Sequence, residues 1–126
     1  MNAGGDTHAH QLDGLKILVV EDESIISFLI EDMLLALGCG SVWHAGAVAQ
    51  AIALLNERRP DAAVLDLNLS GEPAYPIAEN LEARGIPFVF ATGYGAAGVA
   101  KRWTGKPVVQ KPFTLESLET ALRSAL

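Results

Sequence analysis

The sequence has a single cysteine and few basic residues. Cys39 alone excludes a disulfide bond within the chain and fits a reducing compartment. Lysine and arginine together number 9, against 15 aspartates and glutamates, which gives a formal net charge of -6 at pH 7. Non-specific nucleic-acid binding requires basic residues that face the phosphates. We therefore expect a protein that does not bind nucleic acid.

Several other signals are absent. No apolar run reaches about 18 residues, so we expect no membrane insertion. No apolar run follows a positive patch near the N-terminus, so we expect no secretory signal. The chain also lacks a Walker-type GxxxxGK[ST] motif, and no GxGxxG follows its first aliphatic run, which argues against nucleotide binding. These absences predict a cytoplasmic protein.

The composition favours one globular domain. The 126 residues suit a single domain and leave no room for a second one of ordinary size. Hydrophobic residues make up 50% of the chain and charged residues 19%, as in folded rather than disordered proteins. Residues 1–14 are polar and show no periodicity. We expect a flexible N-terminal tail there and a folded domain over residues 15–126.

Short aliphatic runs alternate with amphipathic segments along that domain. The pattern predicts strands at 16–20, 42–44, 62–66, 86–91 and 108–110. It predicts helices at 25–37, 48–55, 77–81, 96–103 and 115–122, the last one capped by Thr114. This is a (βα)5 plan of the α/β class. We expect a doubly wound, parallel, five-stranded sheet in the flavodoxin-like order 2-1-3-4-5, with helices on both faces.

Polar residues follow or end four of the predicted strands. Glu21 and Asp22 follow the first strand, Asp66 ends the third, Thr92 follows the fourth and Lys111 follows the fifth. Each has an ordinary structural explanation, since acids favour the first turn of a helix and a single lysine is usually solvated. All of them meet at one edge, however, where doubly wound sheets bind ligands. We therefore expect a functional site at this edge.

The residue types at this edge limit the chemistry. Clustered carboxylates repel one another, and a hard cation that prefers oxygen ligands, Mg²⁺ or Mn²⁺, relieves the repulsion. An aspartate is a competent nucleophile toward phosphorus, and an ammonium and a hydroxyl stabilise the oxygens of the transferring group. No general base stands ready for rapid hydrolysis. Such a set suits storing a phosphoryl group better than turning over a substrate.

These residues, in this order, resemble the receiver domain of two-component response regulators. The resemblance covers residues 15–126. It rests on four motifs: Ile17-Leu18-Val19-Val20-Glu21-Asp22-Glu23, Val64-Leu65-Asp66-Leu67-Asn68-Leu69, Phe90-Ala91-Thr92-Gly93 and Gln110-Lys111-Pro112-Phe113. Each motif alone is weak evidence, whereas the four together are specific.

The resemblance implies a role for each site residue. Asp66 would accept a phosphoryl group from the phosphohistidine of a histidine kinase. The metal would bind Asp66, Asp22 and the backbone carbonyl of Asn68 directly, and Glu21 through a water molecule. Thr92 would move onto the phosphoryl oxygens. Lys111 would pair with them or, before modification, with Asp66, and the Lys111–Pro112 peptide would be cis.

The sequence also departs from the usual receiver pattern. Val108 stands where receivers usually carry an aromatic switch residue, and the segment from Phe90 to Gly95 instead resembles the FATGUY subgroup, largely stand-alone domains from alphaproteobacteria. That resemblance makes Tyr94 a candidate switch residue beside Thr92. Ser70 stands where receivers often have proline, so we expect a differently shaped loop. Glycines and alanines after Thr92 favour a short or mobile fourth helix.

We expect a single-domain response regulator that switches protein–protein interactions in a phosphorelay. Its partners would be a histidine kinase and either a downstream target or a competing regulator, and it would be a monomer or a weak dimer. It would catalyse only its own phosphotransfer and slow dephosphorylation. One alternative is a pseudo-receiver that acts as a binding module. A phosphatase with an aspartyl-phosphate intermediate is disfavoured because Asn68, two residues after Asp66, cannot exchange a proton.

Overall fold

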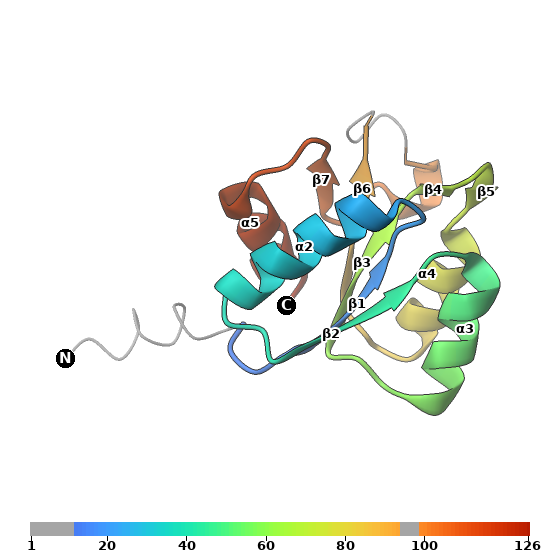
Figure 1. The fold of residues 1–126 in the computed structure, drawn as a ribbon. Coiled ribbons are helices and arrows are strands. Elements are labelled where there is room, and N and C mark those ends of the chain that lie inside the picture. Colours follow the sequence, from blue (N-terminus) through green and yellow to red (C-terminus); the bar gives the residue numbers. More distant parts are fainter. Residues whose placement is uncertain (1–11, 94–98) are drawn as a thin grey trace.

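The structure is a computed structural model that describes residues 12–93 and 99–126 (Figure 1). Most of the predicted N-terminal tail, residues 1–11, therefore lies outside the described residues. The last three residues of that predicted tail form a turn. In this turn Leu12 is 2% exposed and packs in the hydrophobic core, and the Gly14 amide donates to the carbonyl of Gly38. The packed part of the chain thus already includes Leu12, ahead of the boundary predicted at Leu15.

Five parallel strands form one sheet in the order β2-β1-β3-β6-β7. They are β1 (Lys16–Val20), β2 (Ser41–Ala45), β3 (Ala62–Asp66), β6 (Phe88–Thr92) and β7 (Val108–Gln110). Because β6 and β7 are the fourth and fifth strands of this sheet along the chain, the predicted order 2-1-3-4-5 is confirmed. A separate antiparallel hairpin follows β3 and pairs β4 (Asn68–Leu69) with β5 (Glu72–Pro73).

Helices cover both faces of the sheet (Figure 1). They are α2 (Ser24–Ala36), α3 (Val48–Glu57), α4 (Tyr75–Ala83) and α5 (Leu115–Ala125). Successive residues of β1 divide between the two faces: Ile17 packs in the core with α2 and α5, whereas Leu18 packs in the core with α3 and α4. Such burial on both sides explains why the strands consist of continuous aliphatic runs.

The predicted helix over residues 96–103 is wrong in its described part. Residues 96–98 lie outside the described residues, Ala100 is extended, and only the 3-10 turn η2 (Lys101–Trp103) follows. Four α-helices therefore accompany the sheet in the described chain, rather than the five predicted. The Ala100 amide donates to the Tyr75 hydroxyl at 2.7 Å instead of to a helical carbonyl, and the Trp103 side chain, 3% exposed, packs edge-on against Phe88 and Phe90.

The predicted cap of the last helix is confirmed. The Thr114 hydroxyl accepts from the Ser117 amide at 3.0 Å, and the Ser117 hydroxyl accepts from the Thr114 amide at 2.9 Å. Each side chain thus satisfies a backbone donor that the first turn of a helix leaves without a partner. The reciprocal pair fixes the start of α5 just after the loop that carries Lys111.

Replacement of Thr114 by alanine should lower the free energy of unfolding by about 1 kcal/mol, the usual cost of losing an N-cap hydroxyl. Urea denaturation would measure the difference. Thr120→Ala is a suitable control because Thr120 is exposed further along the same helix. Equal stabilities of the two variants would show that the cap contributes nothing.

Candidate functional site

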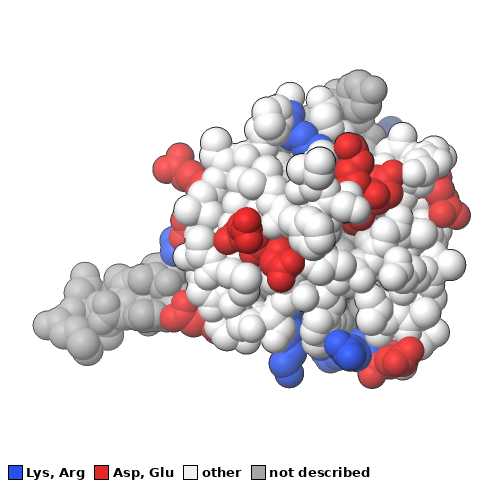
Figure 2. Space-filling model, viewed as in Figure 1, with Lys and Arg blue, Asp and Glu red and all other residues white. Residues whose placement is uncertain are grey.

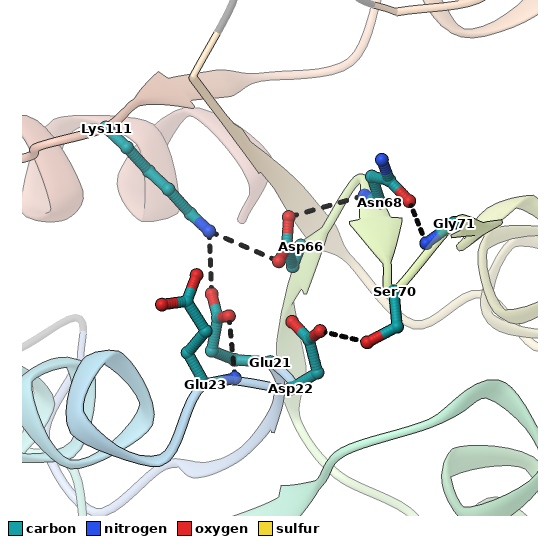
Figure 3. Close-up of polar contacts among 8 residues, drawn as sticks. All are labelled: Glu21, Asp22, Glu23, Asp66, Asn68, Ser70, Gly71 and Lys111. Carbon is teal, nitrogen blue, oxygen red and sulfur yellow. Dashed lines mark hydrogen bonds and ion pairs between the residues drawn. The ribbon is translucent and has the colours of Figure 1, made fainter.

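The sheet brings the predicted site residues to its carboxyl edge. Glu21 and Asp22 directly follow β1, Asp66 ends β3 and Thr92 ends β6. Lys111 follows β7 and precedes Pro112 through a cis peptide bond, as the sequence resemblance implied. Figure 3 shows the acidic side chains and Lys111 pointing toward one another from these separate segments. Tyr94, the predicted switch residue, lies outside the described residues.

Three carboxylates converge at this edge. Glu21, Asp22 and Asp66 each offer one oxygen, and these oxygens all lie within 4.8 Å of one another. The side chain of Glu21 is fully buried and that of Asp66 is 10% exposed, whereas Asp22 lies nearer the solvent. An all-oxygen set of this kind fits a hard divalent cation such as Mg²⁺, which is commonly held by one or two carboxylates together with waters.

Lys111 bridges two of these acids. Its Nζ atom lies 2.8 Å from Oε1 of Glu21 and 3.2 Å from Oδ2 of Asp66. The pair with Asp66 was implied by the sequence resemblance, whereas the shorter contact with Glu21 was not foreseen. The sequence places both residues at the same edge of the sheet, 90 positions apart in the chain, but it does not tell which carboxylate the ammonium contacts more closely. The ammonium therefore lies between the carboxylates of Glu21 and Asp66.

The surroundings shift the pKa values of Glu21, Asp22 and Lys111. Burial raises the pKa of Glu21, the charge of Asp66 adds to this effect, and the hydrogen bonds from Lys111 and the Glu23 amide oppose it. Burial alone would lower the pKa of Lys111, but its bonds and charge interactions with Glu21 and Asp66 outweigh burial and raise it. A hydrogen bond from Ser70 is the main reason that the pKa of Asp22 is lowered.

A cavity of about 490 Å³ opens beside Asp66. Its walls include Asp66, Thr92, Lys111 and two residues that sequence reasoning did not connect with the site, Tyr75 and Pro73. Thr92 is 3% exposed and Asp66 is 8% exposed, so little of either residue is accessible to this space. The cavity gives a phosphoryl group room to approach the Asp66 carboxylate.

The hairpin after β3 forms one side of the site. Ser70 and Gly71 make its turn with positive φ angles of 53° and 88°. The Ser70 hydroxyl donates to Oδ2 of Asp22, and the side-chain oxygen of Asn68 accepts from the Gly71 amide at 2.8 Å (Figure 3). Sequence reasoning anticipated an unusual loop at Ser70 but not its contact with a site acid.

The fold and the site together define a class. The chain is a doubly wound α/β protein with an acidic, lysine-bridged site at the carboxyl edge of its sheet. The sequence-family model for the response regulator receiver domain matches residues 17–123, and the chain belongs to this family. Its members are signalling domains of two-component systems rather than catalytic enzymes.

Solved structures agree with this assignment. SdrG from Sphingomonas melonis Fr1, determined in solution, is 43% identical, with 88% of this chain and 95% of that chain covered and a TM-score of 0.76. The response regulator PhyR from Brucella abortus is 24% identical, covers 98% of this chain and 52% of its own, and has a TM-score of 0.77, which shows the shared fold alone.

Curated relatives are longer proteins. The "Probable transcriptional regulator ycf27" of Cyanophora paradoxa is 31% identical over 122 residues, which is 92% of this chain and 50% of that protein. The chain thus spans about half the length of the curated relatives it matches. Among the residues that the structure describes, no helix is long and apolar enough to cross a membrane.

Proposed function

We propose that this protein is a response regulator that accepts a phosphoryl group from a histidine kinase onto Asp66 and thereby changes its protein partners. The observation that carries the proposal is the cluster of three carboxylates bridged by Lys111, of which Asp66 and Lys111 also line the open cavity. One carboxylate oxygen of Asp66 attacks phosphorus as the bond to the donor histidine nitrogen breaks. The products are an acyl phosphate on Asp66 and a neutral donor histidine, whose proton is the one that the other ring nitrogen of the phosphohistidine already carries.

The neighbouring residues have distinct roles in this proposal. Asp22, Asp66 and the backbone carbonyl of Asn68 would hold Mg²⁺ or Mn²⁺ directly, and Glu21 would hold it through a water molecule. The cation would neutralise negative charge on the phosphoryl oxygens. Lys111 is already 3.2 Å from Asp66 and contributes a second positive charge beside the same oxygens.

Thr92 and the local charge give the proposal its switching character. The Thr92 hydroxyl, at the end of β6, would hydrogen-bond a phosphoryl oxygen and so report the modification. The three carboxylates and one ammonium leave a formal charge of -2, which one divalent cation cancels. A phosphoryl group then adds about 1.5 to 2 negative charges. Phosphorylation therefore makes a site of zero formal charge negative. By the FATGUY resemblance, Tyr94 would transmit this change to a partner.

Asn68 favours storage of the phosphoryl group over rapid hydrolysis. Its side-chain oxygen is engaged by the Gly71 amide, so the residue braces the hairpin. An amide at this position cannot act as a general acid or base. This argues for a phosphorylated state that persists, as a signalling protein needs, and against turnover of phosphate esters.

Incubation with a small phosphodonor and Mg²⁺ tests the proposal directly. Intact-protein mass spectrometry should show the gain of one phosphoryl group, and omission of Mg²⁺ should prevent it. SdrG has been solved in a BeF3-activated conformation, so beryllofluoride is a suitable unreactive mimic. Absence of a mass gain, together with absence of Mg²⁺ binding, would favour a binding module instead.

An exposed apolar surface beside the site suggests where the donor binds. Ile25, Phe28 and Leu29, here called the α2 patch, are 84%, 62% and 51% exposed. On the face in Figure 2, uncharged side chains cover much of the surface over α2, with acidic side chains beside them. An apolar cavity of about 230 Å³ adjoins the patch and is lined by Leu29, Pro112 and Lys111. Since Lys111 also contacts Asp66, a donor segment docked there would lie close to the acceptor.

Replacement of Ile25 by serine should slow phosphotransfer from the cognate kinase about fivefold or more, because loss of a central hot-spot contact costs more than about 1 kcal/mol of binding energy. Transfer from a small phosphodonor should not change. Leu35→Ser is the matched control, since Leu35 is 47% exposed on the same helix but far from the site residues along it. Equal kinase rates for both variants would contradict docking at the α2 patch.

A further inference from the structure

Ser70 has a backbone conformation that serine rarely adopts. Its φ of 53° makes it the one non-glycine residue with a positive φ in the described ranges 12–93 and 99–126. The left-handed region brings the Cβ atom of an L-residue close to the next carbonyl oxygen, so only glycine enters it without cost. Such strained residues persist where surrounding contacts hold them in place, and they cluster at functional sites.

The contacts around the hairpin explain how the conformation is held. The β4–β5 pairing joins Asn68 to Pro73 and Leu69 to Glu72, and Leu69 is anchored in the core at 3% exposure. The Asn68 side chain accepts from the Gly71 amide and closes the turn from within. The hairpin is therefore fixed at its base and across its turn.

The left-handed conformation of Ser70 allows its side chain to contact the carboxylate cluster. The Ser70 hydroxyl donates to Oδ2 of Asp22, a residue 48 positions earlier in the chain. Figure 3 shows the other carboxylate oxygen of Asp22 on the side that faces Glu21 and Asp66. One carboxylate oxygen of Asp22 thus accepts from the hairpin, and the other oxygen faces the carboxylate cluster. No other hydrogen bond from the hairpin to Asp22 is present among the described residues.

We propose that Ser70 is a positioning residue for the divalent cation, because its hydroxyl holds Asp22 in the orientation in which its free oxygen serves as a ligand. The inference rests on the proposed function, since it assumes a metal at this cluster. Asp22 is the most solvent-accessible of the three acids, so without Ser70 its side chain would sample several rotamers. Ordering it again would then be part of the cost of binding the metal.

Hydrogen-bond partners of metal ligands typically change metal affinity 10- to 100-fold when they are removed. We therefore expect Ser70→Ala and Ser70→Gly each to weaken Mg²⁺ binding by about tenfold, as measured by isothermal titration calorimetry on the unphosphorylated protein. Both variants lack the hydroxyl, but only glycine removes the backbone strain. If Ser70 acts through its hydroxyl, the two variants should lose similar affinity. Ser70→Gly should nevertheless melt at the same or a higher temperature than Ser70→Ala without metal.

A second measurement separates positioning from a general effect on the hairpin. In an Asp22→Ala background there is no carboxylate for Ser70 to orient, so Ser70→Ala should cause no further loss of Mg²⁺ affinity. Unchanged affinity in both single Ser70 variants, or an equal loss with and without Asp22, would overturn the inference. Failure of the proposed function would look different, because the unmodified protein would then bind no Mg²⁺ and accept no phosphoryl group.

Discussion

Asp66→Asn is expected to abolish phosphoryl acceptance and to leave the fold intact. An amide has no nucleophilic oxygen of comparable reactivity, and no other carboxylate of the cluster ends a strand inside the cavity as Asp66 does. The variant also removes one of the three converging carboxylates, so its affinity for Mg²⁺ should fall and the rise in melting temperature caused by Mg²⁺ should shrink.

The measurement combines intact-protein mass spectrometry after incubation with a phosphodonor and a thermal melt with and without Mg²⁺. Glu23→Gln is the matched control, because Glu23 lines the same cavity but is not one of the three clustered acids. This control should still gain one phosphoryl group. A mass gain in Asp66→Asn would mean that another residue is the acceptor, and peptide mapping would locate it.

Phe90→Ala is expected to destabilise the protein by about 3–5 kcal/mol, the usual range for a fully buried phenylalanine. Phe90 is 0% exposed, and its ring packs edge-on against Tyr75, Phe88 and Trp103 with centroid distances of 6.1, 5.5 and 6.2 Å. The lost ring would leave a cavity in the core beside the segment that carries Thr92. Small domains have only about 5–15 kcal/mol of stability in total, so this single change is severe.

Urea denaturation followed through tryptophan fluorescence would give the difference. Phe90→Leu retains much of the buried volume and should lose clearly less, which keeps the test informative if the alanine variant does not fold. Phe28→Ala serves as the control, since Phe28 is 62% exposed, and should change stability by no more than about 0.5 kcal/mol. Similar losses at positions 28 and 90 would contradict the packing described for the aromatic cluster.

The parts of the structure that the sequence predicts well depend on local patterns. Buried parallel strands consist of aliphatic runs, so β1 and β3 are evident from the chain, and the residue that ends each run must lie at one edge of the sheet. The convergence of Glu21, Asp66 and Lys111 follows from this rule alone. The Thr114 cap is likewise a local signal with a local cause.

The parts that the sequence does not predict depend on contacts between distant residues. The bond from Ser70 to Asp22 joins positions 48 residues apart and requires a positive φ that serine does not suggest. The sequence predicts a helix over residues 96–103 that its glycines weaken. The described end of that segment instead follows tertiary packing, because Trp103 is buried and the Tyr75 hydroxyl accepts from the Ala100 amide at 2.7 Å.

The position of Lys111 has a thermodynamic consequence. Its side chain lines both the cavity beside Asp66 and the apolar cavity beside the α2 patch. A phosphoryl group on Asp66 that attracts the Lys111 ammonium would move the Lys111 side chain. That movement would change one wall of the apolar cavity where a partner docks. Linkage then requires reciprocity: the factor by which phosphorylation alters the partner's affinity equals the factor by which the bound partner alters the phosphorylation equilibrium. A peptide that occupies only the apolar cavity would therefore shift how much aspartyl phosphate the protein holds, without touching phosphorus.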